Sequence, residues 1–164
     1  SGANGIGLLV SSIYLLYSLG HKQHITKSIK AELHEQNIGF QTLRAIPVGI
    51  GNMTWYGVVR NNDTRYVGKY SDLDHTHIQF HAFPINEHLL DPVNPDLSEN
   101  LKWFAQDHFT VSKENGRLRF YNFQCDMQGV RNYDKYKAPT ASYFEITPQL
   151  DGSDELKIGM HTNE

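Results

Sequence analysis

The first 21 residues of the chain contain no lysine, arginine, aspartate or glutamate, and the first charged side chain is Lys22. Within this stretch, residues 6–19 carry leucine, isoleucine, valine or tyrosine at 10 of 14 positions. A helix that is apolar on every side lies in a protein core or in lipid, because water would otherwise surround its whole apolar surface. This segment therefore limits the folds open to the chain more than any other.

Two interpretations of residues 6–19 stay open from the residues alone. A membrane span needs about 20 apolar residues, and the segment lacks the basic start and the small-residue cleavage site of a signal peptide. Its length fits a core helix lying across a sheet, and it also fits the last turns of a truncated membrane helix. Because the chain starts with Ser1 and not with methionine, we expect a cut fragment of a longer protein.

The helix is predicted to continue beyond the apolar segment with one apolar face. Ile25, Ile29 and Leu33 recur at intervals of four residues, which is the spacing of one face of an α-helix. The pattern stops near Asn37, and Gly39 is predicted to take the left-handed conformation that ends the helix. Residues 1–40 are thus expected to form one long helix, composed of the residual end of a membrane helix and an amphipathic part.

Residues 41–164 are predicted to be rich in β-structure. Runs of β-formers bounded by turn residues indicate strands at residues 42–48, 55–60, 65–70, 76–83, 109–113, 117–125, 143–147 and 156–160. A helix start at residues 96–99 interrupts them, and the apolar stripe of this short helix comprises Leu97, Leu101, Phe104 and Ala105. The predicted fold is α+β and a single domain, with the long N-terminal helix packed on a mostly antiparallel sheet of about six to eight strands.

Charge and cysteine content exclude several classes of function. The formal net charge is −3, and the 15 lysines and arginines are scattered along the chain, so the basic stripe of a nucleic-acid-binding protein is missing. The single cysteine, Cys125, cannot form an internal disulfide or a two-cysteine metal site, and its strand-like setting predicts a buried thiol. The sequence has no P-loop, no nucleophile elbow and no H-E-x-x-H motif, so no catalytic residue is assigned.

The segment LDHTHIQFH, residues 73–81, is the densest group of histidines in the chain. If residues 76–83 form a strand, Ile78, Phe80 and Ala82 share the core face while the histidines share a wet face. His75 and His77 lie two residues apart and could both bind a zinc ion, whereas His81 lies about 13 Å further along a strand. Zinc binding by His75 and His77 is therefore kept as an alternative to a solvated sheet face.

Trp55 opens a predicted strand directly after a glycine-rich connector. A tryptophan at this position is typically a core anchor, because it buries a large apolar area. It could also form one wall of a ligand pocket, together with the tyrosine-dotted loop that contains Tyr133 and Tyr136. Trp55, Tyr133 and Tyr136 are therefore the predicted ligand-binding residues.

The segment TLRAIPVGIGNMTWYGVVRNNDTRYVGKYSDLD, residues 42–74, resembles the C-terminal soluble part of the membrane-bound metal-dependent hydrolase-like proteins. This bacterial family is also described as LexA-binding, inner-membrane-associated hydrolases. The family pattern of an alanine-proline strand, an asparagine-containing connector and a tryptophan opening the next strand is matched by Ala45, Pro47, Asn52 and Trp55. NLKWFAQDHFTV and ENGRLRFYNF resemble the helix and hairpin that follow, so the similarity extends over most of residues 15–123. Residues 120–129 depart from the family, whose acidic-arginine-phenylalanine-glycine ending is replaced here by QCDMQG.

The resemblance implies a helix that leaves a membrane, with residues 1–20 as the end of its last span. It also implies that a divalent metal is bound in an N-terminal membrane portion outside this chain, so no metal ligand is carried over onto any residue here. The leading hypothesis is therefore a soluble, membrane-tethered domain of a metal-dependent hydrolase without a complete active site of its own. A ligand- or partner-binding module with no catalytic role is the first alternative. Lysines at positions 22, 27 and 30 favour the cytoplasmic side of the membrane.

Overall fold

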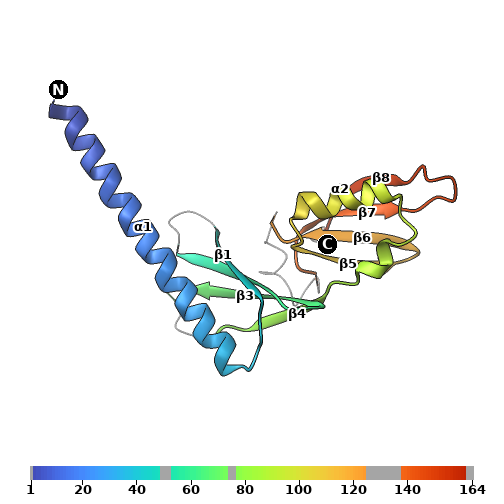
Figure 1. The fold of residues 1–164 in the computed structure, drawn as a ribbon, viewed down its shortest axis with the longest axis horizontal. Coiled ribbons are helices and arrows are strands. Elements are labelled where there is room, and N and C mark those ends of the chain that lie inside the picture. The colour runs from blue at the N-terminus through green and yellow to red at the C-terminus, as the bar shows by residue number, and fades with distance from the viewer. Residues whose placement is uncertain (1, 49–52, 74–76, 125–137, 162–164) are drawn as a thin grey trace.

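The structure, a computed structural model, describes residues 2–48, 53–73, 77–124 and 138–161. One helix, α1 (Gly2–Glu35), is followed by two antiparallel four-stranded sheets. The first sheet has the strand order β1 (Thr42–Val48), β2 (Thr54–Arg60), β3 (Thr64–Ser71) and β4 (Phe80–Pro84). The 3₁₀-helix η1 (Glu87–Leu90) and the helix α2 (Pro95–Ala105) then lead into the second sheet (Figure 1), with the order β5 (Phe109–Glu114), β6 (Arg117–Asn122), β7 (Ser142–Thr147) and β8 (Glu155–Met160).

The α+β class and the long N-terminal helix are confirmed, but the prediction of one sheet is wrong, because the eight described strands lie in two sheets. The division falls after β4, which ends at Pro84, a residue without an N–H group to continue a ladder. β5 contacts the end of β4 through a bond from Val111 N–H to the Ile85 carbonyl (3.0 Å) and one from the Thr110 hydroxyl to the Pro84 carbonyl. These two hydrogen bonds connect the sheets, which remain two separate four-stranded ladders.

α1 ends at Glu35, and the left-handed residue that follows it lies two positions before the predicted glycine. Asn37 takes the left-handed conformation with φ 55°, and Gly39 does not. The N–H of Ile38 donates to the Leu33 carbonyl at 2.8 Å, and the N–H of Asn37 donates to the His34 carbonyl at 3.1 Å. This pair of bonds satisfies carbonyls of the last turn. Asparagine serves here because it tolerates positive φ better than most residues.

The second half of α1 packs on one face of the first sheet, as its apolar spacing predicts. Ile25, Ile29 and Leu33 are fully buried there against Trp55 and other residues of the sheet. Gly57 in β2 lets the helix approach, since a Cβ atom at this position would lie 2.9 Å from the side chain of Ile29. On the opposite face of the sheet, the side chains of Tyr56, Val58, Val67 and Phe83 form a second apolar cluster with Phe123, which follows β6.

The predicted strand over residues 76–83 is partly wrong. β4 starts at Phe80, and residues 77–79 are irregular. Ile78 is buried and Phe80 packs against the same cluster, as expected, but Ala82 is exposed and Phe83 is buried. The alternation fails because Phe83 packs against Phe123, on a face of the sheet that the sequence pattern assigned to water.

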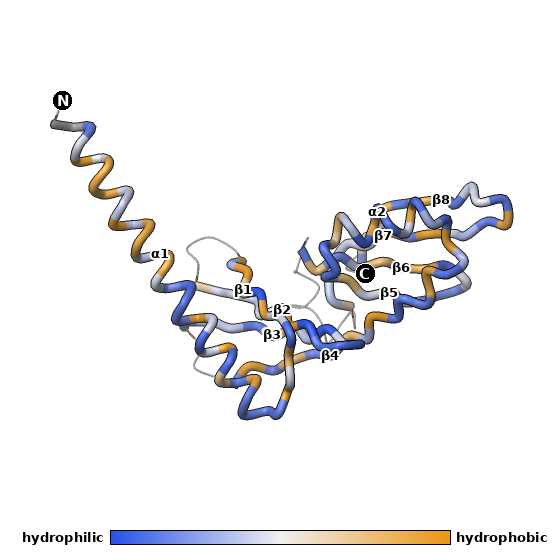
Figure 2. The backbone as a smooth tube through the Cα atoms, in the orientation of Figure 1, coloured by the Kyte–Doolittle hydropathy of each residue, from blue (hydrophilic) through white to orange (hydrophobic). Residues whose placement is uncertain are grey.

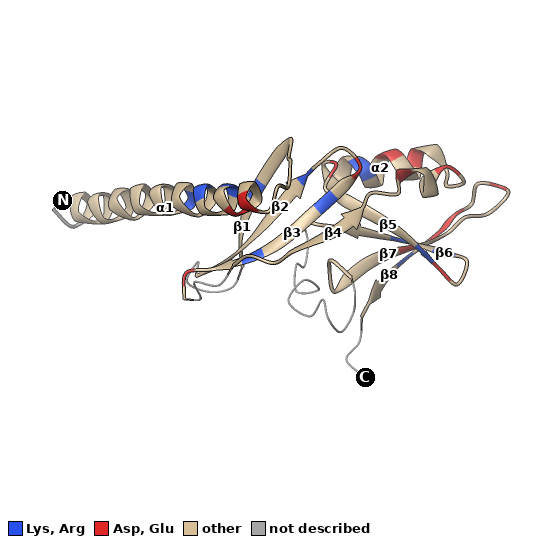
Figure 3. Cartoon of the chain, turned by 90° about the horizontal axis from the view of Figure 1, so that it is seen from below, with Lys and Arg blue, Asp and Glu red and all other residues tan. Residues whose placement is uncertain are grey.

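The first half of α1 extends away from both sheets (Figure 1). Its apolar side chains between Ile6 and Leu19 are 58–73% exposed. In Figure 2 the backbone of this projecting part of the helix carries repeated hydrophobic bands. Lysine bands begin only in the half of the helix next to the sheet (Figure 3). Within the described residues, no helix is long and apolar enough to span a bilayer.

The second sheet has one apolar face and one polar face. α2 covers the apolar face, where Leu101 and Ala105 pack with Phe109 and Phe120 in a separate core cluster. The polar face carries Arg119, whose guanidinium lies 4.5 Å from the ring centre of Tyr143, together with Tyr121 and His161. The turn between β5 and β6 lies between the strands predicted at residues 109–113 and 117–125, and it has positive φ at Asn115 (50°) and Gly116 (79°).

Candidate functional site

The two sheets meet at the C-terminal end of α2, where the buried Arg65 joins them. Its Nε and Nη2 donate to the carbonyl of Asp107 at 3.1 and 2.8 Å, and Nη1 donates to the carbonyl of Asn61 at 3.0 Å. Burial, and then the nearby Arg60, lower the pKa of Arg65 to about 10. The group therefore remains a cation at neutral pH, and it neutralises the negative end of the α2 dipole.

Two further arginines of the first sheet contact the same turn. Arg44 donates from Nη2 to the amide oxygen of Gln106 at 3.1 Å, and Arg60 lies 3.7 Å from the carboxylate of Asp107. Next to this turn His108 is 6% exposed, and its Nδ1 has no hydrogen-bond partner among the described residues. Burial first, and then the surrounding arginines, lower the pKa of His108 to about 4, so the imidazole is neutral at pH 7.

The turn after α2 holds its backbone in an uncommon conformation. Gln106 and Asp107 both take positive φ, at 46° and 60°. Consecutive non-glycine residues in the left-handed region cost free energy, and such positions cluster at binding and active sites. The N–H groups of Gln106 and Asp107 donate back to the carbonyls of Trp103 and Lys102, which holds the turn in place.

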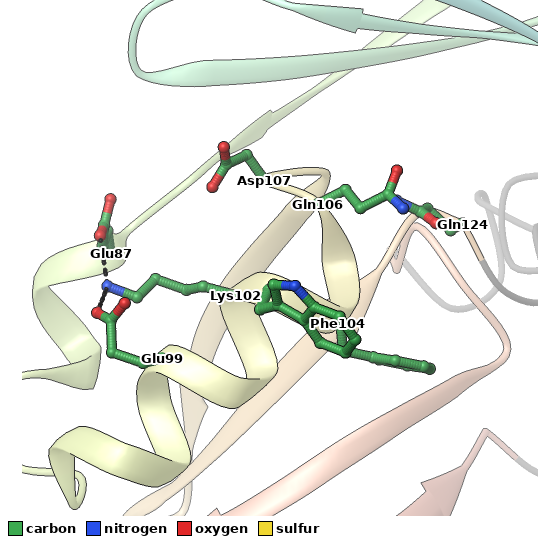
Figure 4. A pocket seen from close by; sticks show the side chains of 8 residues that line it. Glu87, Glu99, Lys102, Phe104, Gln106, Asp107 and Gln124 are labelled. Atoms are coloured by element: carbon green, nitrogen blue, oxygen red, sulfur yellow. Dashed lines mark hydrogen bonds and ion pairs between the residues drawn. The ribbon is translucent and has the colours of Figure 1, made fainter.

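An open groove of about 670 Å³ lies along this end of α2. Trp103 and Phe104 form its apolar part, with Trp103 80% exposed. The polar lining comes from η1, α2, the turn after it and the end of β6: Glu87, Glu99, Lys102, Gln106, Asp107 and Gln124. The Lys102 side chain extends toward Glu87 and Glu99 at one end of the groove, and the Gln106 and Gln124 amides lie at the other end (Figure 4).

The lysine of the groove forms ion pairs with two carboxylates of the groove. Lys102 Nζ lies 2.5 Å from the Glu99 carboxylate and 3.3 Å from that of Glu87. The hydrogen bond to Glu99 is the main cause that raises the pKa of Lys102, so the amine stays protonated. A protonated, paired lysine cannot act as a base or a nucleophile. This arrangement is suited to holding a ligand.

Of the predicted ligand-binding residues, the structure describes only Trp55, which does not line this groove. Trp55 is 3% exposed and packs in the cluster under α1, where its ring meets the edge of His21 at a centroid distance of 5.9 Å. Tyr133 and Tyr136 lie outside the described residues, as does Cys125. A ligand-binding role for Trp55, Tyr133 and Tyr136 stays a prediction. The packing shows Trp55 as an anchor of the core.

The histidine segment contacts α1. His77 is exposed, and its Nδ1 lies 3.1 Å from the Glu32 carboxylate. Glu32, Glu35 and His77 bring one ligand atom each within 4.8 Å of one another, a donor set that suits zinc. His75, the other member of the predicted pair, lies outside the described residues.

The sequence reasoning missed Trp103, and it assigned Phe104 to the apolar stripe of the short helix. In the structure Leu101 and Ala105 are buried, whereas Phe104 is 47% exposed and contacts Phe144 only through its ring edge. The sequence did indicate that Trp103 is exposed. It shares a helix face with the polar residues Glu99 and Asn100, and an aromatic side chain on the polar face of an amphipathic helix faces water.

A search of protein-family models, of curated proteins and of solved structures finds no match to this chain.

Proposed function

We propose that this chain is a membrane-tethered domain of a metal-dependent hydrolase-like protein, and that it binds a ligand or partner through the groove at the end of α2 without catalysing a reaction itself. The observation that carries the proposal is the exposed apolar half of α1. Ten large apolar side chains between residues 6 and 19 face water on all sides of one projecting helix.

Exposed apolar patches of this extent mark contacts with a membrane or with another protein. The segment from residue 6 to residue 19 is about 21 Å long at 1.5 Å per residue, which is about two-thirds of a hydrocarbon layer of about 30 Å. Lys22 follows three residues after Leu19, and a lysine at the end of an apolar helix can place its amine among lipid headgroups. The helix therefore suits insertion from one side, with the sheets held outside.

The assignment to a hydrolase-like protein depends on the resemblance of residues 15–123 to that family. The groove supports a binding role, because its lysine and two of its carboxylates neutralise one another. Turnover of an esterase or phosphoesterase substrate by this chain, abolished by a chelator, would contradict the non-catalytic role. The coding sequence upstream of Ser1 tests the family, which requires several hydrophobic spans with histidines inside them.

Flotation with neutral phosphatidylcholine vesicles tests the tether. The wild-type chain is expected to float with the vesicles, and the variant L9K/I13K/L16K is expected to stay in the dense fraction, because each lysine costs about 2.5–3.5 kcal/mol inside a bilayer. The matched control L150K/I158K/M160K changes three exposed apolar residues outside α1 and should float. A wild-type chain that does not float, or equal flotation of both triple variants, would refute the tether.

The zinc site is retained as a second candidate, because Glu32 and Glu35 supply carboxylates next to His77. If it is correct, zinc raises the melting temperature of the wild-type chain, since a ligand that binds the folded state stabilises it. E35Q/H77A should abolish the rise, while E155Q/H161A, with the same substitutions in β8 and after it, should preserve it. Unchanged melting of the wild type in zinc would remove this candidate.

A further inference from the structure

From the lining of the groove at the end of α2, we infer that it binds a neutral saccharide, with the apolar face of a sugar ring stacked on Trp103 and its hydroxyls bonded to Gln106 and Gln124. This inference rests on the binding role proposed above and names the chemical class of the ligand.

The stacking surface is the exposed indole of Trp103. Tryptophans are usually buried or nearly so, because they remove a large apolar area from water on burial, yet this side chain is 80% exposed. Phe104, half-exposed, lies next to it in the groove. A pyranose ring has one face of C–H groups that covers an indole of this size, and covering it removes apolar area from water.

The two amides supply complementary hydrogen-bonding groups. The Gln106 oxygen accepts from Arg44, so its NH₂ group is left to donate to a ligand. The Gln124 NH₂ group donates to the carbonyl of Ala105 at 2.9 Å, so its oxygen is left to accept. A hydroxyl is both a donor and an acceptor, and a ligand with several hydroxyls can satisfy both amides at once.

The charges of the groove select against ionic ligands. Lys102 is paired with Glu87 and Glu99, and Asp107 is paired with Arg60. Among the described residues of this lining, a phosphate or carboxylate would find no uncommitted cation and would face three carboxylates. A cationic ligand would have to replace Lys102 or Arg60 in an existing ion pair. A neutral ligand leaves all of these pairs intact.

Fluorescence quenching tests the inference, because the chain has two tryptophans and Trp55 is shielded by the core. Acrylamide quenching of the full chain therefore reports mainly on Trp103. The probes are cellohexaose, maltohexaose, xylohexaose and chitohexaose at up to 10 mM, about the upper limit for a weak saccharide site. At least one is expected to reduce the quenching constant of the exposed tryptophan at least twofold, with saturation.

The variant Q106A/Q124A keeps the fluorescent reporter and should weaken binding of that saccharide at least tenfold. The matched control Q41A/Q149A removes two exposed glutamines elsewhere and should bind like the wild type. W103A should show no heat of binding by calorimetry, while its circular dichroism matches the wild type. Protection by none of the four saccharides, protection by a lysine-rich peptide or by inorganic phosphate in their place, or equal binding by both glutamine variants would overturn the inference. Vesicle flotation measures membrane binding independently of fluorescence quenching. A failure of the membrane tether is therefore distinguishable from a failure of saccharide binding.

Discussion

The two regions of the molecule each contain one tryptophan, and the two side chains have opposite environments. Trp55 lies in the first sheet on the face that α1 covers, and it is 3% exposed. Trp103 lies on α2, which covers the second sheet, and it is 80% exposed. The comparison shows that residue type alone does not decide whether a tryptophan is buried, because burial depends on which element packs over its position.

Substitution of the two tryptophans is the strongest test of this comparison. Trp55→Ala is expected to lower the free energy of unfolding by about 3–5 kcal/mol, because it leaves a cavity under α1. Trp103→Ala is expected to change it by less than about 0.5 kcal/mol, since the side chain is mostly in water. Urea unfolding followed by circular dichroism measures both, and similar losses in the two variants would contradict the assigned roles.

Arg65 tests whether the two regions depend on each other. Arg65→Met should lower the free energy of unfolding by about 3 kcal/mol, because it leaves the buried carbonyls of Asp107 and Asn61 without their donors. Arg44→Met is the matched control at an exposed position, and it should cost less than about 1 kcal/mol. If Arg65→Met unfolds in one transition at the wild-type midpoint, the guanidinium does not hold the sheets together.

The pH dependence of the free energy of unfolding tests the contact between the two sheets, where His108 is buried. Because burial and the nearby arginines lower the pKa of His108 to about 4, the unfolded chain binds a proton more readily than the folded chain at acid pH. Stability is therefore complete above the ordinary histidine pKa and is lost as the pH falls toward 4. Between pH 7 and pH 5 the expected loss is about 2 kcal/mol.

His108→Asn should reduce that loss, and His24→Asn, at an exposed position on α1, should leave it unchanged. Urea unfolding at the two pH values measures the effect. Equal losses in the wild type and in His108→Asn would show that another group carries the pH dependence.

The periodic parts of the fold were predictable from the sequence. The spacing of Ile25, Ile29 and Leu33 identified both the helix and the face that packs on a sheet, because a helix repeats locally. The hairpin at Asn115 and Gly116 was predictable for the same reason, since positive φ at two successive residues favours these residue types. Strand positions followed from local β-formers, although β4 begins four residues later than predicted.

The candidate site was less predictable than the elements that form it. Trp103, Gln106 and Gln124 line one groove, but Gln124 follows a strand of the second sheet and Gln106 follows a helix. The conformation of Gln106 and Asp107 could not be read from a sequence without glycine at that turn. The sequence left both a core role and a ligand role open for Trp55, because no local pattern shows that α1 will pack over it.

The sequence by itself determined the helix, most of the strands and an apolar N-terminal segment, because each depends on side chains within a few residues of one another. Only the tertiary structure decided that the strands form two sheets, that Trp55 is buried and Trp103 exposed, and that arginines of the first sheet meet the end of α2. Those outcomes depend on contacts between residues such as Arg65 and Asp107, which lie 42 positions apart in the chain, and no local pattern encodes which distant surfaces will meet.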